Sequence, residues 1–204
     1  IRLSLVGSEM CIRDRVKVCA LSGQIPGKVC PITIHSKFIP GVSPITKCEI
    51  HREVAIDVQT GLRACRDTAR TRKEVYEFWP SDLLAVFREA GIARRLPPPY
   101  LPACRQHAVY TTAGVKPAIS SPYTHVNYYL RAEQTVNKAD EIPLSAVTDA
   151  DVRHVYWFAN EEYLGRSSAQ KPLFWKMRPG KFKIRVIDDH GRSDVRHLNV
   201  LLTQ

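Results

Sequence analysis

The sequence has 204 residues, of which 44% are hydrophobic and 25% are charged, and this balance suits one or two globular domains rather than a disordered chain. No uncharged apolar run of about 18 residues is present, so no membrane span is predicted within it. The net charge of +10 favours anionic surroundings such as a membrane surface, an anionic polymer or nucleic acid, without choosing among them.

The start of the chain follows no structural pattern. The stretch LVGSEMCIRDR (residues 5–15) repeats with neither the period of a strand nor that of a helix. It resembles the read-through translation of a sequencing adapter in one reading frame. We therefore predict that residues 1–15 are an adapter artefact, that the reading frame is truncated and that Cys11 is not a natural cysteine.

Residues 16–52 are rich in Gly and Pro, with short apolar stretches between them, and predict a loop-rich, extended segment. The next stretch, EVAIDVQTGLRA (residues 53–64), has two short apolar runs on either side of Gln59-Thr60-Gly61. This arrangement predicts a β-hairpin in which Gly61 adopts the positive φ angle of the turn.

The stretch SDLLAVFREAG (residues 81–91) predicts the one clear helix of the chain. Ser81 is positioned to cap the first turn, Asp82 suits the positive N-terminal end, and Gly91 can end the helix. The predicted apolar stripe consists of Leu83, Leu84, Phe87 and Ala90.

A proline-rich connector follows the predicted helix. RRLPPPYLP (residues 94–102) is stiff and prone to the polyproline conformation, and the next residues carry no strong pattern. We place the domain boundary there, between a tail segment at 16–110 and a separate domain at 115–204.

From Ala118 onward, apolar and polar residues alternate. In KFKIRV, for example, Phe182, Ile184 and Val186 fall on one face and the basic residues on the other. This alternation predicts strands at 127–132, 142–147, 153–160, 172–175, 181–188 and 194–202. The fold class is therefore mainly β: a loop-rich segment with a β-hairpin and one helix, followed by an immunoglobulin-like antiparallel β-sandwich with Trp157 at its centre.

Three cysteines and one histidine in the loop-rich segment have the letters of a metal site. Cys19, Cys30 and Cys48 follow one another, and Cys48 and His51 form a tight C-x-x-H pair. Zinc knuckles usually supply two such close pairs, so the spacing supports a Cys3His site only weakly. The residues leave open a zinc site, a disulfide framework and free buried thiols.

Several strings of the sequence are similar, in chain order, to those of a known family. They are CALSGQIPGKVC, FIPGVSPITKCEIHR, IDVQTGLRAC, EVYEFWPSDLLAVFREAGI with RRLPPP, and YWFANEEYLG with FWKMRPGKFKIRVIDDHGRSD. They resemble the C-terminal portion of the penicillin-binding protein 1C family, which comprises class A bifunctional peptidoglycan synthases of the Gram-negative periplasm. The resemblance runs from residue 16 to residue 204.

The resemblance implies a parent protein with a glycosyltransferase and a DD-transpeptidase upstream of this chain, attached to the inner membrane through the missing N-terminal part. The chain itself would be a non-catalytic periplasmic fragment that serves as an accessory or interaction module in cell-wall biogenesis. The implied partners are its own upstream transpeptidase domain and either peptidoglycan or an envelope protein, such as an alpha-2-macroglobulin-like protein. We expect no cofactor and no nucleic acid. The alternative is an autonomous carbohydrate-binding or adhesion β-sandwich of the cell envelope.

The catalytic motifs of such synthases are incomplete in this sequence. Ser168-Ala-Gln-Lys171 matches S-x-x-K by letter, but no S-x-N and no K-T-G occurs to complete a penicilloyl serine transferase. Glu161 and Glu162 are adjacent, so on a strand they would face opposite sides and could not act as the paired glutamates of a glycosyltransferase. We therefore predict that this chain has no catalytic residues.

The oxidising compartment that the resemblance implies makes disulfides the default for cysteines in a loop-rich segment. We therefore expect disulfides among Cys19, Cys30, Cys48 and Cys65, with Cys19–Cys30 and Cys48–Cys65 as the simplest pairing, and no metal site. Cys104 has no assigned role.

The sequence also offers a candidate ligand or partner surface. Trp175 could stack on a sugar ring, and a basic stripe follows it. The stripe consists of Lys176, Arg178, Lys181, Lys183 and Arg185. Such a stripe is most often a solvated strand face, and its functional interpretation is contact with an anionic envelope polymer or a partner protein.

Overall fold

The computed structural model of the protein describes residues 14–39, 41–43, 45–105, 114–131 and 141–203. The chain divides into two compact units at Phe78 and Trp79, earlier than the boundary predicted between 110 and 115. Of the predicted adapter artefact at residues 1–15, residues 1–13, including Cys11, lie outside the described residues. Asp14 and Arg15 belong to the first strand.

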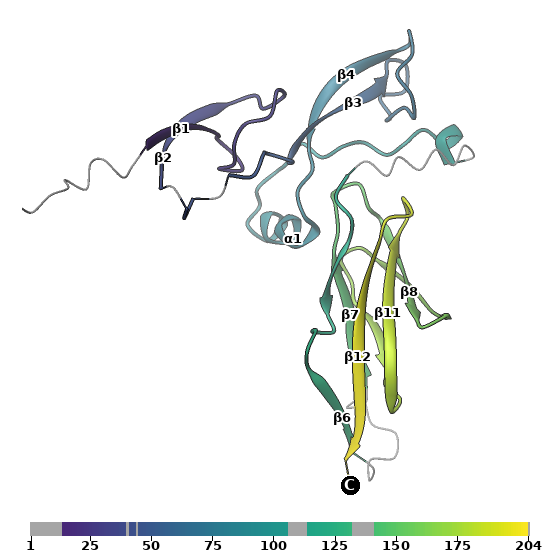
Figure 1. Ribbon diagram of the computed structural model, residues 1–204. Coiled ribbons are helices and arrows are strands. Elements are labelled where there is room, and N and C mark those ends of the chain that lie inside the picture. Colours follow the sequence, from purple (N-terminus) through teal and green to yellow (C-terminus); the bar gives the residue numbers. More distant parts are fainter. Residues whose placement is uncertain (1–13, 40, 44, 106–113, 132–140, 204) are drawn as a thin grey trace, which may run out of the picture. The chain divides into compact units, whose positions relative to one another are not determined.

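The first unit contains two antiparallel strand pairs (Figure 1). They are β1 (Asp14–Cys19) with β2 (Thr33–Phe38), and β3 (His51–Asp57) with β4 (Thr71–Glu77). The predicted turn after β3 is confirmed, with Gly61 at a φ of 69° and the Asp57 carboxylate accepting hydrogen bonds from Gln59 and Thr60. The returning chain forms only an isolated bridge to β3, and β4 is the main partner instead of the predicted second arm.

The first unit buries few apolar side chains. Among the described residues between 14 and 50, only Val18, Cys19 and Cys48 are buried. The β3–β4 pair adds a small cluster of its own, with Val54, Ile56 and Phe78 buried. A two-stranded hairpin with so small a core is marginally stable in water, so β1 and β2 require another source of stability.

The predicted helix is present as α1 (Ser81–Glu89), and Gly91 ends it with a φ of 68°. Ser81 is not its cap, because the chain enters through Pro80 and the Ser81 hydroxyl is used elsewhere. The Ser81 N–H donates to the carbonyl of Thr148 at 2.8 Å, and the Thr148 N–H donates to Ser81 Oγ at 3.0 Å. This reciprocal pair attaches the helix to the second unit and moves the division of the chain to residue 79.

After the proline connector and a short 3-10 helix, η2 (Pro102–Arg105), the strands of the second unit form two sheets. The three-stranded sheet has the order β10 (Leu173–Lys176), β7 (Glu141–Val147), β5 (Ala118–Ser121). The five-stranded sheet has the order β6 (Asn127–Arg131), β12 (Ser193–Thr203), β11 (Gly180–Asp188), β8 (His154–Ala159), β9 (Glu162–Ser168). All neighbours are antiparallel except β6 and β12, which are parallel. Thus the predicted β-sandwich is confirmed, with one parallel pair that was not foreseen.

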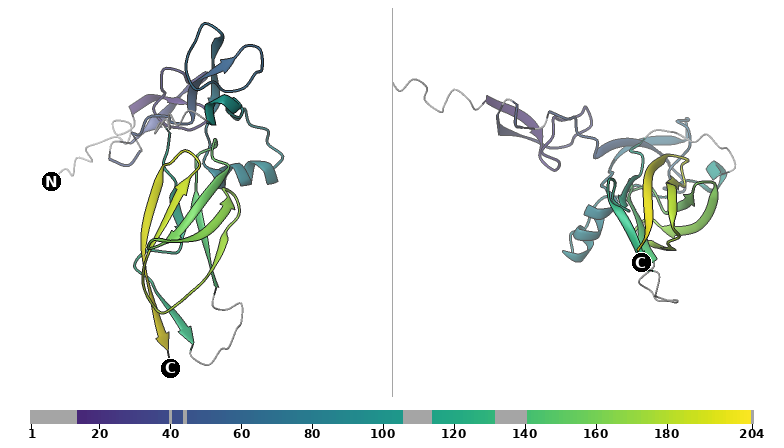
Figure 2. Two further views of the ribbon diagram at one scale, coloured as in Figure 1. Left: turned by 90° about the vertical axis from the view of Figure 1, so that its right-hand side faces the viewer. Right: turned by 60° about the horizontal axis from the view of Figure 1, so that its bottom comes forward.

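The two sheets enclose a single apolar core, and the right-hand view in Figure 2 shows the strands of both sheets arranged around it. Trp157 is fully buried in this core, as predicted, and its indole N–H donates to Ser167 Oγ at 3.3 Å. Ile184 and Val186 of β11 are also fully buried, so the predicted inward face of that strand is confirmed. Among the described residues, no helix is both long and apolar enough to cross a membrane.

Candidate functional site

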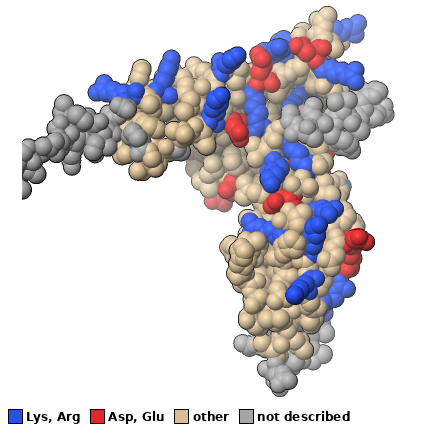
Figure 3. All heavy atoms as spheres, in the orientation of Figure 1, with Lys and Arg blue, Asp and Glu red and all other residues tan. Residues whose placement is uncertain are grey.

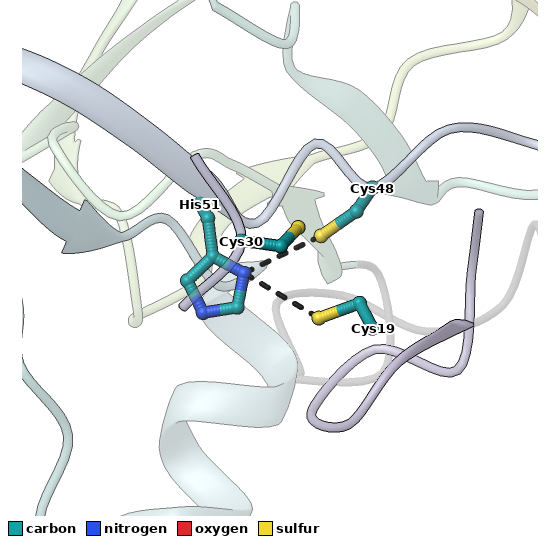
Figure 4. A group of neighbouring side chains, drawn as sticks. All are labelled: Cys19, Cys30, Cys48 and His51. Atoms are coloured by element: carbon teal, nitrogen blue, oxygen red, sulfur yellow. Dashed lines mark hydrogen bonds between the residues drawn. The ribbon is translucent and has the colours of Figure 1, made fainter. Parts of the chain in front are cut away.

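Cys19, Cys30, Cys48 and His51 converge on one point of the first unit. Their three Sγ atoms and one imidazole nitrogen all lie within 4.8 Å of one another. His51 Nδ1 is 3.5 Å from the Sγ atom of Cys19 and 3.5 Å from that of Cys48. Figure 4 shows the three thiol groups gathered beside the same edge of the imidazole ring.

Backbone hydrogen bonds between two loops hold the cysteines in place. The N–H of Ile25 donates to the carbonyl of Thr46 at 3.0 Å, and the N–H of Cys48 donates to the carbonyl of Ile25 at 2.8 Å. These bonds join the loop after β1 to the segment before β3, which carries Cys48 and leads into His51, the first residue of β3. The backbone N–H of Gly27 donates to Cys30 Sγ at 3.2 Å and orients the third thiol.

The predicted disulfide pairing is wrong. Cys19, Cys30 and Cys48 are free thiols, so neither Cys19–Cys30 nor Cys48–Cys65 is formed. The chain turns after Pro26-Gly27, where the N–H of Cys30 donates to the carbonyl of Gly27 at 3.2 Å, but this turn brings Cys30 to a group that also contains Cys48 and His51 rather than to Cys19 alone. Cys65 is disulfide-bonded, as is Cys104, to which the sequence assigned no role.

The protonation of the cluster follows from burial and from local hydrogen bonds. Burial opposes ionisation of Cys19, but hydrogen bonds from Ser22 outweigh it and lower the pKa of this thiol from 9.0 to about 7. Burial, and then a hydrogen bond with Cys48, raise the pKa of Cys30 to about 12. Burial also lowers the pKa of His51, against the opposing effect of the Glu77 carboxylate, so its imidazole is held in the neutral form that a metal ion requires.

The predicted ligand surface is divided by the fold. Trp175 is only 6% exposed and packs edge-on against Phe182, with ring centroids 5.0 Å apart, so it belongs to the core and cannot stack on a sugar. Lys176 lies on β10, in the other sheet from β11, and Arg178 pairs with Glu162. The stripe therefore does not form one continuous surface.

Three members of the predicted stripe do share a face. Lys181, Lys183 and Arg185 alternate along β11 with its core residues and point to the outer side of the five-stranded sheet. Basic side chains are spread over the visible face of the molecule in Figure 3, with acidic side chains among them.

A shallow pocket of about 540 Å³ lies on this outer side. Its lining includes Lys181, Lys183, His197, Asn160 and Asn199. The register places Lys181 opposite Asn199, and Lys183 opposite His197, on neighbouring strands. The pocket thus presents ammonium, imidazole and amide groups side by side, and these can donate hydrogen bonds to hydroxyl, amide and carboxylate groups of a ligand.

A buried ion-pair network that was not predicted from the sequence lies at the turn between β11 and β12. The side chain of Arg192 is 4% exposed, and its guanidinium lies 2.7 Å from Asp188, 3.1 Å from Asp151 and 3.5 Å from Asp149. Burial would lower the pKa of Arg192, but Asp151 and then Asp188 outweigh it and raise the pKa. In the sequence DDHGR is only the short connection between two predicted strands, and no local pattern shows that two further aspartates pack against Arg192.

Ser168, the serine of the S-x-x-K match, is the last residue of β9. Its carbonyl accepts a hydrogen bond from the N–H of Lys171 at 3.1 Å, so the two residues belong to a turn rather than to the start of a helix. This placement does not set up the lysine-activated serine of a penicilloyl serine transferase.

Comparison with known proteins places both units. Residues 106–199 match the Penicillin-Binding Protein C-terminus Family, and residues 14–53 match the C-terminal domain of penicillin-binding protein 1A. No curated protein matches the chain. Among solved structures, the fibronectin(III)-like modules of Clostridium thermocellum CbhA are similar at 17% identity, covering 43% of this chain and 99% of that chain with a TM-score of 0.33.

The two family matches follow the order of the two units, and the match at residues 14–53 contains all four residues of the cysteine cluster. The finer assignment to the 1C family stays a prediction. The chain therefore carries C-terminal domains of penicillin-binding proteins at residues 14–53 and 106–199.

Proposed function

We propose that the chain is the accessory C-terminal part of a periplasmic peptidoglycan synthase, and that the outer side of its five-stranded sheet contacts peptidoglycan. The observation that supports the accessory role is the presence of two penicillin-binding protein C-terminal families, in order, in one chain. The synthase would carry its glycosyltransferase and transpeptidase outside this chain and would be attached to the inner membrane.

The pocket on the five-stranded sheet suits this ligand chemically. Peptidoglycan offers sugar hydroxyls, amide groups and peptide carboxylates. Lys181 and Lys183 supply positive charge for carboxylates, and both are exposed. The amides of Asn127 and Asn199 are already joined by a hydrogen bond of 3.1 Å, which fixes their orientation for further contacts with hydroxyl and amide groups.

Co-sedimentation of the chain with purified sacculi tests this proposal. The wild-type chain should sediment with sacculi, and Lys181→Ala/Lys183→Ala should reduce the bound fraction severalfold. Lys171→Ala/Lys176→Ala removes the same charge from exposed residues that do not line the pocket and is the matched control. Equal binding by both double variants, or no binding by the wild type, would overturn the peptidoglycan contact.

The second candidate partner is an envelope protein, including an alpha-2-macroglobulin-like one. The same exposed face supports it, because exposed cationic and amide groups also suit an acidic protein surface. Failure to bind sacculi, together with capture of one purified envelope protein that depends on Lys181 and Lys183, would favour this candidate.

A further inference from the structure

We propose that Cys19, Cys30, Cys48 and His51 bind one structural Zn²⁺ ion. Three thiols and one imidazole are a ligand set that zinc takes in closed structural sites. A disulfide could use only two of the three sulfur atoms, whereas a tetrahedral ion uses all three together with the ring nitrogen.

The distances within the cluster suit a tetrahedral ion. With Zn–S bonds of about 2.3 Å and a Zn–N bond of about 2.0–2.1 Å, tetrahedral geometry requires about 3.8 Å between sulfur atoms and about 3.5 Å between sulfur and nitrogen. The distances from His51 Nδ1 to Cys19 Sγ and to Cys48 Sγ are both 3.5 Å. The whole set lies within 4.8 Å, so only small side-chain shifts are needed to close the site.

The imidazole presents the correct atom. Nδ1 of His51 faces two thiols at equal distance, as expected for an atom that donates its lone pair to an ion shared with them. If Nδ1 carried a hydrogen instead, it could form a well-aligned hydrogen bond with only one of the two sulfur atoms. His51 is 5% exposed, and its Nε2 has no hydrogen-bond partner among the described residues. A metal ion on Nδ1 would fix the ring proton on Nε2.

The environment of the thiols also favours a bound ion. The backbone N–H of Gly27 points at Cys30 Sγ, and such N–H groups stabilise the negative charge of a coordinating thiolate. Cys19 and Cys48 are buried, whereas Cys30 is partly exposed and leaves a side from which an ion can enter.

The β1–β2 part of the first unit, residues 14–50, needs such an ion for its stability. Between residues 14 and 50, the buried side chains of the described part are Val18 and two of the ligands themselves, Cys19 and Cys48. Several large apolar side chains of the same segment are exposed instead: Leu21, Ile25, Ile32, Ile34, Val42 and Ile45. Burial of so few apolar side chains cannot stabilise the fold of this segment. Small folds without a sizeable apolar core often depend on a metal ion or on disulfides.

Metal analysis of the purified full chain tests the proposal. The chain is loaded with Zn²⁺ under reducing conditions and desalted, and its zinc content is measured by inductively coupled plasma mass spectrometry. We expect one zinc per chain for the wild type and loss of that zinc in Cys48→Ser. His35→Ala is the matched control for His51→Ala, because His35 is an exposed histidine on β2 and should leave the zinc in place.

Cobalt substitution separates ligation from a folding defect. Co²⁺ bound to the wild-type chain should show thiolate charge-transfer bands and the intense visible bands of a tetrahedral ion. His51→Cys should keep one metal per chain and shift those visible bands, since it replaces nitrogen by sulfur in the same position. A wild-type chain that binds no metal, that gives an octahedral cobalt spectrum, or whose Cys19, Cys30 and Cys48 react with iodoacetamide equally with and without zinc would overturn the proposal.

Discussion

Arg192 Nε donates a hydrogen bond to Asp188 Oδ2 at 2.7 Å, and the two side chains are 4% and 0% exposed. Asp188 ends β11 and Arg192 precedes β12, so this pair closes the turn between the strands. The same guanidinium reaches Asp149 and Asp151, which lie after β7. The buried guanidinium therefore links the ends of β11 and β12 in the five-stranded sheet to the end of β7 in the three-stranded sheet.

We predict that Arg192→Ala destabilises the protein by about 3–5 kcal/mol, because it leaves three buried carboxylates without their cation. Arg192→Lys keeps the positive charge but lacks the forked donors of a guanidinium. It should therefore destabilise the protein by less than Arg192→Ala does. Urea unfolding monitored by tryptophan fluorescence measures both, with the exposed Lys171→Ala as the control. A loss below about 1 kcal/mol for Arg192→Ala would show that the carboxylates are satisfied without it.

Trp157→Ala should cost about 3–5 kcal/mol, because the ring is fully buried at the centre of the sandwich and its removal leaves a cavity. Tyr129→Ala is the matched control: this aromatic residue of the same sheet is 58% exposed, and its removal should change stability by no more than about 0.5 kcal/mol. Circular dichroism melting of both variants measures the difference. Similar losses for the two would contradict the central position of Trp157.

The alternation of apolar and polar residues was sufficient to predict most of the sandwich. In β8 and β11 every second side chain enters the core, and this leaves a period of two in the sequence. β9 was missed because none of its side chains is fully buried, so EYLGRSS carries no such period. The parallel contact between β6 and β12 joins residues far apart in the chain, and no local pattern records it.

The ligands of the cysteine cluster were also visible in the sequence, but their convergence was not. Only Cys48 and His51 are close in the chain; Cys19 and Cys30 reach them through the backbone hydrogen bonds that Ile25 makes with Thr46 and Cys48. Spacing rules cannot foresee contacts of this kind between two loops. The choice of disulfides rested on the expected compartment, which says nothing about where the sulfur atoms lie.

We predict that a fragment of residues 79–204 melts at a higher temperature than a fragment of residues 115–204. The shorter fragment lacks Ser81 and leaves the N–H and carbonyl of Thr148 without their partners, at a cost of about 1–3 kcal/mol for each buried group. The longer fragment should carry Cys104→Ser so that neither fragment contains a thiol. Equal melting temperatures would support the later boundary predicted from the sequence.

The chain should form no covalent adduct with a fluorescent penicillin. Ser168 ends a strand, and Lys171 is exposed in the turn that follows, so no lysine amine is set to activate the serine as a transpeptidase requires. Gel electrophoresis after incubation with the labelled drug measures the adduct. A labelled band that disappears in Ser168→Ala would contradict this prediction.

Removing zinc should unfold the β1–β2 part of the chain and leave the sandwich folded. Structural zinc contributes about 10–16 kcal/mol of apparent binding free energy in zinc-finger peptides, far more than the few buried side chains of residues 14–50 can supply. The sandwich has a core of its own that contains no ligand of the cluster.

Hydrogen exchange of the reduced full chain, with and without a strong chelator, measures this difference. Peptides from residues 14–50 should lose their protection when the chelator is added and regain it with excess zinc, whereas peptides from β11 and β12 should not change. Cys48→Ser should resemble the chelated protein without any chelator, because three remaining ligands hold the ion poorly. If the protection of residues 14–50 is the same with and without metal, hydrogen bonds between the two loops are enough to hold this segment, and the ion has no part in its folding.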